Sequence, residues 1–86
     1  MDVLKVSSRS VPTAVAGAIS AVVREKGEVE VQAVGAGAVN QAVKAAAIAR
    51  GYLATAGIDM VVLPAFGNVI ISDEEKTGIR LLCVER

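Results

Sequence analysis

Two glycines and three polar residues form the stretch of this sequence that is best suited to bind a ligand. Gly35 and Gly37 join an apolar, strand-like run to an alanine-rich helix, and Asn40, Gln41 and Lys44 follow in its first turns. Glycine lets the backbone take positive φ and approach a neighbour closely, and a helix begins with free N–H groups and a partial positive charge. Such a position favours an anion, usually phosphate. The backbone groups available to it are those of Gly35, Ala36, Gly37 and Ala38.

The same glycines have two other interpretations. They can simply permit a tight strand-to-helix connection with close packing, and spacing alone favours this structural role. They also begin a dinucleotide-binding fingerprint, but Asn40 stands where its third glycine belongs. A chain of 86 residues is also too short for both halves of a dinucleotide-binding fold. A nucleotide-binding enzyme is therefore a minor hypothesis.

A second group of candidate residues lies in the loop before the first predicted helix. Ser8, Arg9 and Ser10 stand there, and a guanidinium among hydroxyl groups at the start of a helix can hold a phosphate. Arg9 can equally be an ordinary solvated charge, and taken alone it fits that description better. Ser8, Arg9 and Ser10 are therefore candidate contacts to nucleic acid.

Residue types that usually carry catalysis are scarce. The chain has no histidine and a single cysteine, Cys83, in an apolar strand-like run, where the expected role is that of a small buried hydrophobe. No two carboxylates share an apolar setting that would separate their pKa values for acid–base work. We therefore expect no enzymatic activity, no metal site and no cofactor.

Charge and hydropathy bound the remaining functions. Nine basic and nine acidic side chains give a net charge of zero, so any contact with nucleic acid must be local. Apolar residues make up 53% of the chain, and so small a domain has limited interior to cover them. We expect a homo-oligomer, either a dimer or a tetramer. The lack of a long apolar run or a basic leader predicts a soluble, cytoplasmic protein that does not contact a membrane.

Hydrophobic periodicity predicts two helices and four strands. The helices are expected at residues 12–26 and 36–53, with Gly27 ending the first. The strands are expected at residues 3–6, 28–34, 58–71 and 79–84, and residues 73–78 are expected to form a polar turn. In the third strand we expect Pro64 to interrupt the pairing and residues 67–68 to allow a bend or bulge.

The predicted helices differ in their apolar faces. The first carries one stripe suited to burial, formed by Val15, Ala18, Ile19, Val22 and Val23. The second, with Val39, Val43 and Ala46 on one side and further alanines on the others, is apolar nearly all round. Such a helix is normally covered on more than one side.

The β-α-β-α-β-β order predicts a single α/β domain over residues 1–86. Right-handed crossovers place both helices on one face of a four-stranded mixed sheet, as a two-layer sandwich. The other face of the sheet is left uncovered in a single copy unless its side chains are polar or paired.

The longest motif in the chain is residues 34–51, VGAGAVNQAVKAAAIARG. This unbroken run resembles the stage V sporulation protein S family, and shorter matches at residues 3–7 and 15–18 extend the resemblance over essentially the whole chain. The resemblance implies a role in the regulation of sporulation and of related developmental or cell-division events.

More distantly, the order of elements and residues 37–44 are similar to the Alba family of dimeric DNA- and RNA-binding chromatin proteins. That resemblance implies an Alba-like fold, in which basic residues of the first strand-to-helix loop and of the second helix meet the phosphate backbone while the final hairpin reaches into a groove. Arg9 stands where the loop has a basic pair, with Ser8 replacing the other member. Gly37 and Gln41 occupy positions that tend to be basic, and only Lys44 keeps a charge nearby, so few phosphate contacts are implied.

Three functions follow from these observations. The first is a non-enzymatic regulator that binds DNA or RNA weakly, aided by avidity between copies. The second is a protein-interaction or scaffold module on the same fold without nucleic-acid binding. The third, with less support, is a sensor that binds a phosphorylated metabolite at the turn of residues 35–40.

Overall fold

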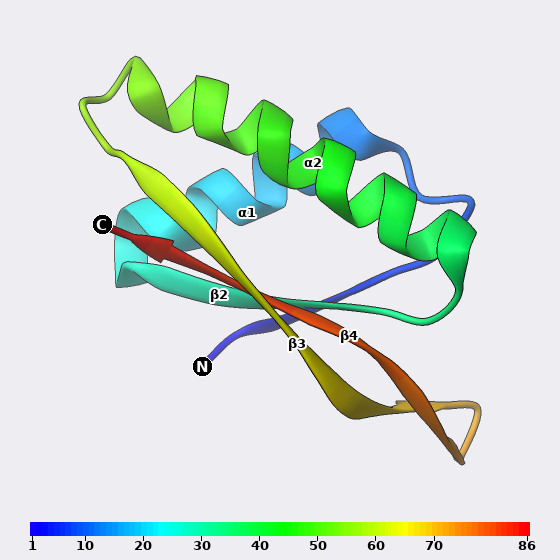
Figure 1. The fold of residues 1–86 in the computed structure, drawn as a ribbon. Helices are drawn as coiled ribbons and strands as arrows, with labels where there is room; N and C mark the ends of the chain where they lie inside the picture. Colours follow the sequence, from blue (N-terminus) through cyan, green and yellow to red (C-terminus); the bar gives the residue numbers. More distant parts are fainter.

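A computed structural model describes all 86 residues of the chain. Six elements follow one another in the predicted order, with strands and helices alternating before a final hairpin (Figure 1). They are β1 (Val3–Val6), α1 (Pro12–Lys26), β2 (Glu28–Ala33), α2 (Ala36–Ala54), β3 (Met60–Ile71) and β4 (Glu74–Glu85).

The four strands form one mixed sheet in the order β1-β2-β4-β3. β1 and β2 are parallel, whereas β4 pairs antiparallel with both β2 and β3. Both helices lie on the same face of this sheet (Figure 1), which confirms the predicted two-layer α/β architecture. Val6 at the end of β1 is the register partner of Ala33 at the end of β2. The two loops that lead into the helices therefore leave the sheet at the same edge, the one formed by the carboxyl ends of β1 and β2.

α1 begins and ends at the predicted residues. Pro12 lies in its first turn, and Gly27 ends it in a left-handed conformation (φ 85°), with its N–H donating to the carbonyl oxygen of Val23. The buried face is turned from the predicted stripe because the helix also packs on α2. This face is formed by Ala16, Ile19, Ser20 and Val23, whereas Val15, Ala18 and Val22 are only half-buried. The Ser20 hydroxyl donates to the carbonyl oxygen of Ala16, 2.8 Å away, and so is satisfied in the core.

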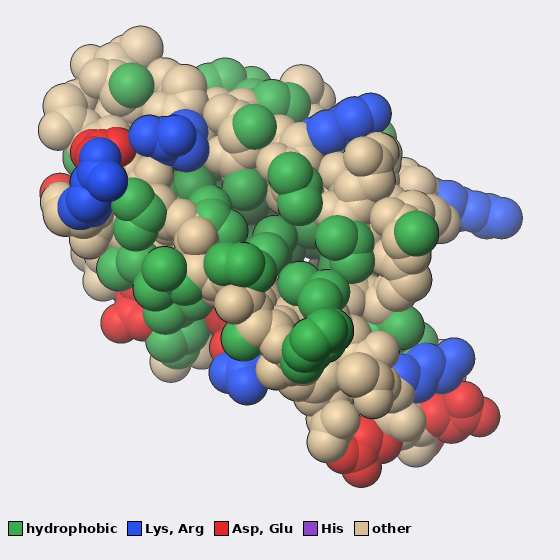
Figure 2. Space-filling view, in the orientation of Figure 1, with side chains coloured by type: hydrophobic (Ala, Val, Ile, Leu, Met, Phe, Trp, Pro, Cys, Tyr) green, Lys and Arg blue, Asp and Glu red, His purple; other side chains and the backbone are tan.

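α2 packs through small side chains. Its buried residues are Ala38, Ala42, Ala45, Ala46, Ala49 and Leu53. Val43, on another side of the helix, is 52% exposed, so the expected cover on more than one side is incomplete in a single copy. Figure 2 shows hydrophobic side chains gathered around a hollow between α2 and β3. Despite this composition, neither helix has the length and apolar character needed to cross a membrane.

β3 is more regular than predicted. It is continuous from Met60 to Ile71 and pairs residue for residue with β4, with Pro64 opposite Leu81 and Gly67 opposite Gly78. The predicted interruption at Pro64 and the predicted bend or bulge at residues 67–68 are therefore wrong. β3 lies at the edge of the sheet, where the missing N–H of proline need not break a ladder on both sides.

The hairpin turn is also shorter than predicted. Only Ser72 and Asp73 lie between the two strands, both with positive φ (50° and 63°), and β4 begins at Glu74. Two central residues with positive φ are typical of the tight turn whose twist matches a hairpin. The acidic residues assigned to a loop therefore lie partly in a strand.

The core lies between the helices and the inner face of the sheet, where Val29, Val31 and Cys83 are fully buried. The outer face carries Glu30, only 8% exposed. Its carboxylate accepts hydrogen bonds from Arg80 (2.7 Å) and from the Gln32 amide (2.6 Å). These donors, Arg80 first, hold the pKa of Glu30 below its usual value. The face that no helix covers is therefore centred on paired polar groups.

Candidate nucleic-acid interface

The loop between β1 and α1 is folded by its own serines. The backbone N–H of Ser7 donates to the Ser10 hydroxyl oxygen (2.9 Å), and the backbone N–H of Arg9 donates to the Ser7 hydroxyl oxygen (3.2 Å). The N–H of Ser10 closes the turn on the carbonyl oxygen of Ser7 (3.1 Å). Because these bonds hold the backbone, the Arg9 side chain projects from a defined turn. Its guanidinium forms no ion pair or hydrogen bond within the chain.

The start of α2 presents free donors. Gly35 precedes it with φ 89°, a conformation that side chains disfavour. No side chain caps the helix, and the first hydrogen bond that closes it is donated by Val39 to the Gly35 carbonyl oxygen. The N–H groups of residues 36–38 therefore point out of the helix without a side-chain acceptor. α1 starts at the same sheet edge and is likewise uncapped, with Val11 at its N-cap position.

The serine loop lies directly against the start of α2. Gln41 donates from Nε2 to the carbonyl oxygen of Ser10, 3.0 Å away. A Cβ placed on Gly37 would lie 3.0 Å from the Cβ of Ser8, which is a close approach that only glycine allows without a shift. The two groups of candidate residues, which are far apart in the sequence, are thus in contact.

The other candidates surround this contact. Arg9, Gly35, Ala36, Asn40 and Lys44 are exposed. Lys44 has no ion-pair partner and lies one turn beyond Asn40, at the (i, i+4) position that shares its side of a helix. Ala38 is buried, so only its backbone faces this edge.

No carboxylate interrupts these segments. The nine acidic residues all lie outside residues 3–24 and 31–58, which contain the serine loop, most of α1 and all of α2. Those two segments carry Lys5, Arg9, Arg24, Lys44 and Arg50. In a chain of zero net charge, these two segments therefore hold cations and no acids, and no acidic side chain lies in the first turn of either helix.

The hairpin limits the directions from which a ligand can approach. Lys5 donates from Nζ to the carbonyl oxygen of Ile70, 2.8 Å away. Ile70 and Ser72 share a hollow with Ser7 and Ser10 on the sheet side of the loop. The acidic turn that begins after Ser72 therefore lies near this hollow, whereas the first turns of both helices carry no acidic side chain.

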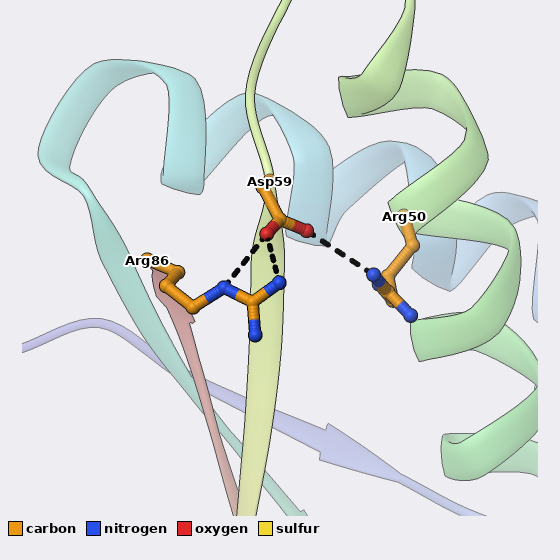
Figure 3. A network of polar contacts seen from close by, with 3 residues as sticks. All are labelled: Arg50, Asp59 and Arg86. Carbon is orange, nitrogen blue, oxygen red and sulfur yellow. Dashed lines mark hydrogen bonds and ion pairs between the residues drawn. The ribbon is translucent and has the colours of Figure 1, made fainter.

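The remaining polar clusters have structural explanations. Asp59 accepts from Arg86 Nε (2.8 Å) and from Arg50 Nη2 (3.1 Å), which fastens the chain end to α2 (Figure 3). The two guanidiniums, Arg86 first, hold the pKa of the Asp59 carboxyl below its usual value. Burial raises the pKa of the Cys83 thiol to about 11, so it is a poor nucleophile at neutral pH. No group of three metal-ligating side chains occurs in the chain.

One feature of this site, the uncapped start of α1, was not predicted from the sequence. The uncapped start of α1 at Val11 lies beside that of α2. The signal that predicts it is the parallel pairing of the first two strands, since each β-to-α connection then leaves the sheet at the same end. Gln41 also has a more specific place than expected, because one of its amide donors holds the loop.

The fold and this edge define a small two-layer α/β protein in which a serine loop, free of acidic residues, packs on the uncapped start of a helix. The chain belongs to the stage V sporulation protein S (SpoVS) family, whose model matches residues 2–86. This confirms the resemblance carried by residues 34–51, and it implies a role connected with sporulation. The likeness to Alba proteins stays a prediction.

Proposed function

We propose that this protein is a non-enzymatic regulator of sporulation that binds nucleic acid through the phosphate backbone. The observation that carries the proposal is the contact of the serine loop with the start of α2, made by Gln41 and Ser10. This contact brings the loop that carries Arg9 against the start of α2, whose first backbone N–H groups are uncapped, and neither segment contains a carboxylate. Phosphate oxygens are the ligands that such donors suit.

Each group has a distinct role in the proposal. The N–H groups of residues 36–38 and the Arg9 guanidinium donate to phosphate oxygens, and Lys44 adds a second cation farther along α2. Asn40 offers an amide to the phosphates or sugars, while Gln41 and the hydroxyls of Ser8 and Ser10 shape the loop and its polar surface. Contacts to phosphate do not distinguish one base from another. We therefore expect little sequence preference, and we expect the binding to be weak.

The small number of cations makes assembly important to the proposed function. Two side-chain cations release few counterions, so the affinity of one copy is low and depends weakly on salt. A homo-oligomer, either a dimer or a tetramer, would present the same edge two or four times to one nucleic acid and raise the overall affinity. No metal, cofactor or chemical step enters this function.

A second candidate function rests on a different observation. The hollow between α2 and β3 is apolar and exposed, and surfaces of this kind mark sites of protein contact. A scaffold that uses only this groove predicts that the protein functions without binding nucleic acid.

Fluorescence anisotropy with labelled duplex DNA, single-stranded DNA and RNA separates the two functions. At low salt we expect binding. The logarithm of the association constant should decrease with the logarithm of the salt concentration, and each of Arg9→Ala and Lys44→Ala should make this slope shallower by about one. Arg24→Ala, which removes an exposed cation from the last turn of α1, is the matched control and should leave the slope unchanged. No binding of any nucleic acid at low salt, or equal losses in all three variants, would overturn the proposal.

A further inference from the structure

The exposed ring of Phe66 lies beside the start of α2. Phe66 is the only phenylalanine of the chain and is 81% exposed. It lines a hollow of about 250 Å³ together with residues that include Gly35, Ala36, Val39 and Thr77. In Figure 1 the start of α2 lies above the hairpin end of β3 and β4, and residues of both line this hollow. An aromatic ring and the proposed phosphate-binding residues therefore share one surface.

The register of β3 turns the ring towards the helix layer. Side chains of a strand alternate between the two faces of the sheet. Met60 lies an even number of positions before Phe66 in β3 and is fully buried in the core under the helices, so both side chains are on the face that the helices cover. Phe66 itself takes no part in the core. The ring is thus held by a paired strand and left open to a ligand.

We infer that the nucleic acid bound at this site is single-stranded, with one unpaired base stacked on Phe66. The inference rests on the proposed function, in which the N–H groups of residues 36–38 hold a phosphate. Ala36 belongs to both places, because it is the first residue of the uncapped helix and also lines the hollow. Since one sugar joins a base to its phosphate, a single nucleotide can reach both groups.

An exposed aromatic ring suits a base better than it suits a phosphate. Every base has a flat π face, and stacking on aromatic side chains is a usual way for proteins to hold single strands. In a duplex these faces are covered by the neighbouring base pairs, and flipping a base out costs free energy. A preference for single strands therefore follows from the ring, whereas a preference for one base over another does not.

The other groups around the hollow also fit a nucleotide. Val39 and Ile79 give apolar walls, and the exposed Thr77 brings a hydroxyl that can donate to or accept from the edge of a base. No carboxylate lines the hollow. Glu75 is on the same face of β4 as Thr77 but nearer the hairpin tip. We therefore expect the phosphate chain to leave the site away from the tip, towards the serine loop that packs on α2.

Anisotropy titrations with three labelled oligonucleotides of equal length test the inference. They are a DNA single strand, the same strand with abasic sites in place of its nucleotides, and a duplex. We expect the wild-type protein to bind the single strand about tenfold more tightly than the abasic strand. Phe66→Ala should lose this difference, with unchanged affinity for the abasic strand and for the duplex, because it keeps every phosphate contact.

Two further substitutions and a control separate stacking from apolar contact. Phe66→Leu keeps the apolar bulk without the ring and should behave like Phe66→Ala, whereas Phe66→Tyr keeps the ring and should behave like the wild type. Leu63 is another large apolar side chain of β3, 53% exposed, on the opposite face of the strand. Leu63→Ala is therefore the matched control and should retain the tenfold difference. Circular dichroism checks that each variant is folded.

A tryptophan in place of Phe66 reports the stacking directly. The chain has no tryptophan, so selectively excited emission from Phe66→Trp comes from this position alone. We expect the single strand to quench this emission and the abasic strand to leave it unchanged. Leu63→Trp, with its indole on the outer face of the sheet, should be quenched by neither.

The outcomes distinguish this inference from the proposed function. If the abasic strand binds as tightly as the single strand, or if Phe66→Ala keeps the tenfold difference, no base stacks on Phe66, although phosphate binding stands. If none of the oligonucleotides binds at low salt, the proposed function fails and this inference fails with it. Emission typical of a buried indole in free Phe66→Trp would show that a second copy covers the ring, which would also overturn the inference.

Discussion

Gln41 of α2 donates a hydrogen bond from Nε2 to the backbone carbonyl oxygen of Ser10, 3.0 Å away, across 31 positions of the sequence. This bond joins the loop after β1 to the helix after β2. It can form because the two strands are parallel and end side by side, with Val6 opposite Ala33. Together with the close approach of Ser8 to Gly37, this bond holds a short polar loop against the uncapped start of a helix.

Removing the Gln41 amide should loosen the loop without changing the charge of the protein. We expect Gln41→Ala to lower the free energy of unfolding by about 1 kcal/mol and to weaken nucleic-acid binding by about fivefold. Asn40→Ala is the neighbouring control for stability alone, because the Asn40 side chain makes only a long contact with Gln41 (3.4 Å). Urea unfolding and anisotropy titrations measure the two effects. If Gln41→Ala bound nucleic acid as tightly as the wild type, the position of the loop would have no role in binding.

A methyl group on Gly37 should disturb the site more than the fold. Its Cβ would lie 3.0 Å from the Cβ of Ser8, whereas a Cβ on Gly17 of α1 would have no neighbour within 4 Å. Gly17→Ala should therefore gain about 0.5–1 kcal/mol of stability from helix propensity. Gly37→Ala should gain less and bind nucleic acid several-fold more weakly, because the loop must move. Equal gains with unchanged affinity would show that this close approach has no role.

The network at Glu30 should make stability depend on acid pH. Because hydrogen bonds from Arg80 and Gln32 lower the pKa of the folded carboxyl, the unfolded chain binds the proton more readily. The contribution is present in full well above pH 4.5, the usual pKa, and is lost as the pH falls below it towards the lowered value. Glu30→Gln should cost about 1–2 kcal/mol at pH 7 and much less at pH 3. Thermal unfolding over this range is the measurement.

The exposed carboxyl of Glu74, whose only ion pair is a 3.9 Å contact with Lys76, is the comparison for that series. Glu74→Gln should change stability little at any pH, since exposed ion pairs contribute little. If the difference between Glu30→Gln and the wild type stayed constant from pH 7 to pH 3, the cost would come from packing and not from the charge of Glu30.

Gly78 should be intolerant of any side chain. A Cβ there would lie 2.7 Å from the carbonyl oxygen of Ala33 and 2.9 Å from Cγ2 of Val34, so β4 could not stay in register beside β2 without a shift. We expect Gly78→Ala to lose about 1–3 kcal/mol of stability. Gly51→Ala in α2, where the added methyl meets nothing within 4 Å, should gain up to about 1 kcal/mol. Chemical denaturation of both variants tests the contrast, which a stable Gly78→Ala would contradict.

Local signals in the sequence account for most of the fold. Pro12 and Gly27 mark the ends of α1 because each has a fixed conformational preference, and the alternation of valines in β2 gives its period directly. The prediction failed at Pro64, because whether proline breaks a strand depends on whether that strand lies at an edge, and strand order is a property of the whole sheet. The same limit applies to Val43, whose exposure depends on where β3 packs relative to α2.

The candidate site could be predicted only in its parts. Gly35 and Gly37 are recognisable from their place before a helix, and Arg9 from its loop. Their contact depends on the parallel pairing of β1 and β2, and the specific hydrogen bond of Gln41 depends on the rotation of α2 about its axis. The strand pairing and the rotation of α2 both depend on residues outside the site, so the sequence indicates the two candidate groups but not the bond that joins them.

The measurement that tests the central claim most directly is a ¹⁵N–¹H NMR titration of the labelled protein with a short duplex at low salt. The account predicts that the largest shifts fall on the backbone amides of Arg9 and of residues 36–38, with little change in the hairpin at Ser72 and Asp73. Shifts that centre on the hairpin or on the outer sheet face around Glu30, or a spectrum that does not change, would contradict it.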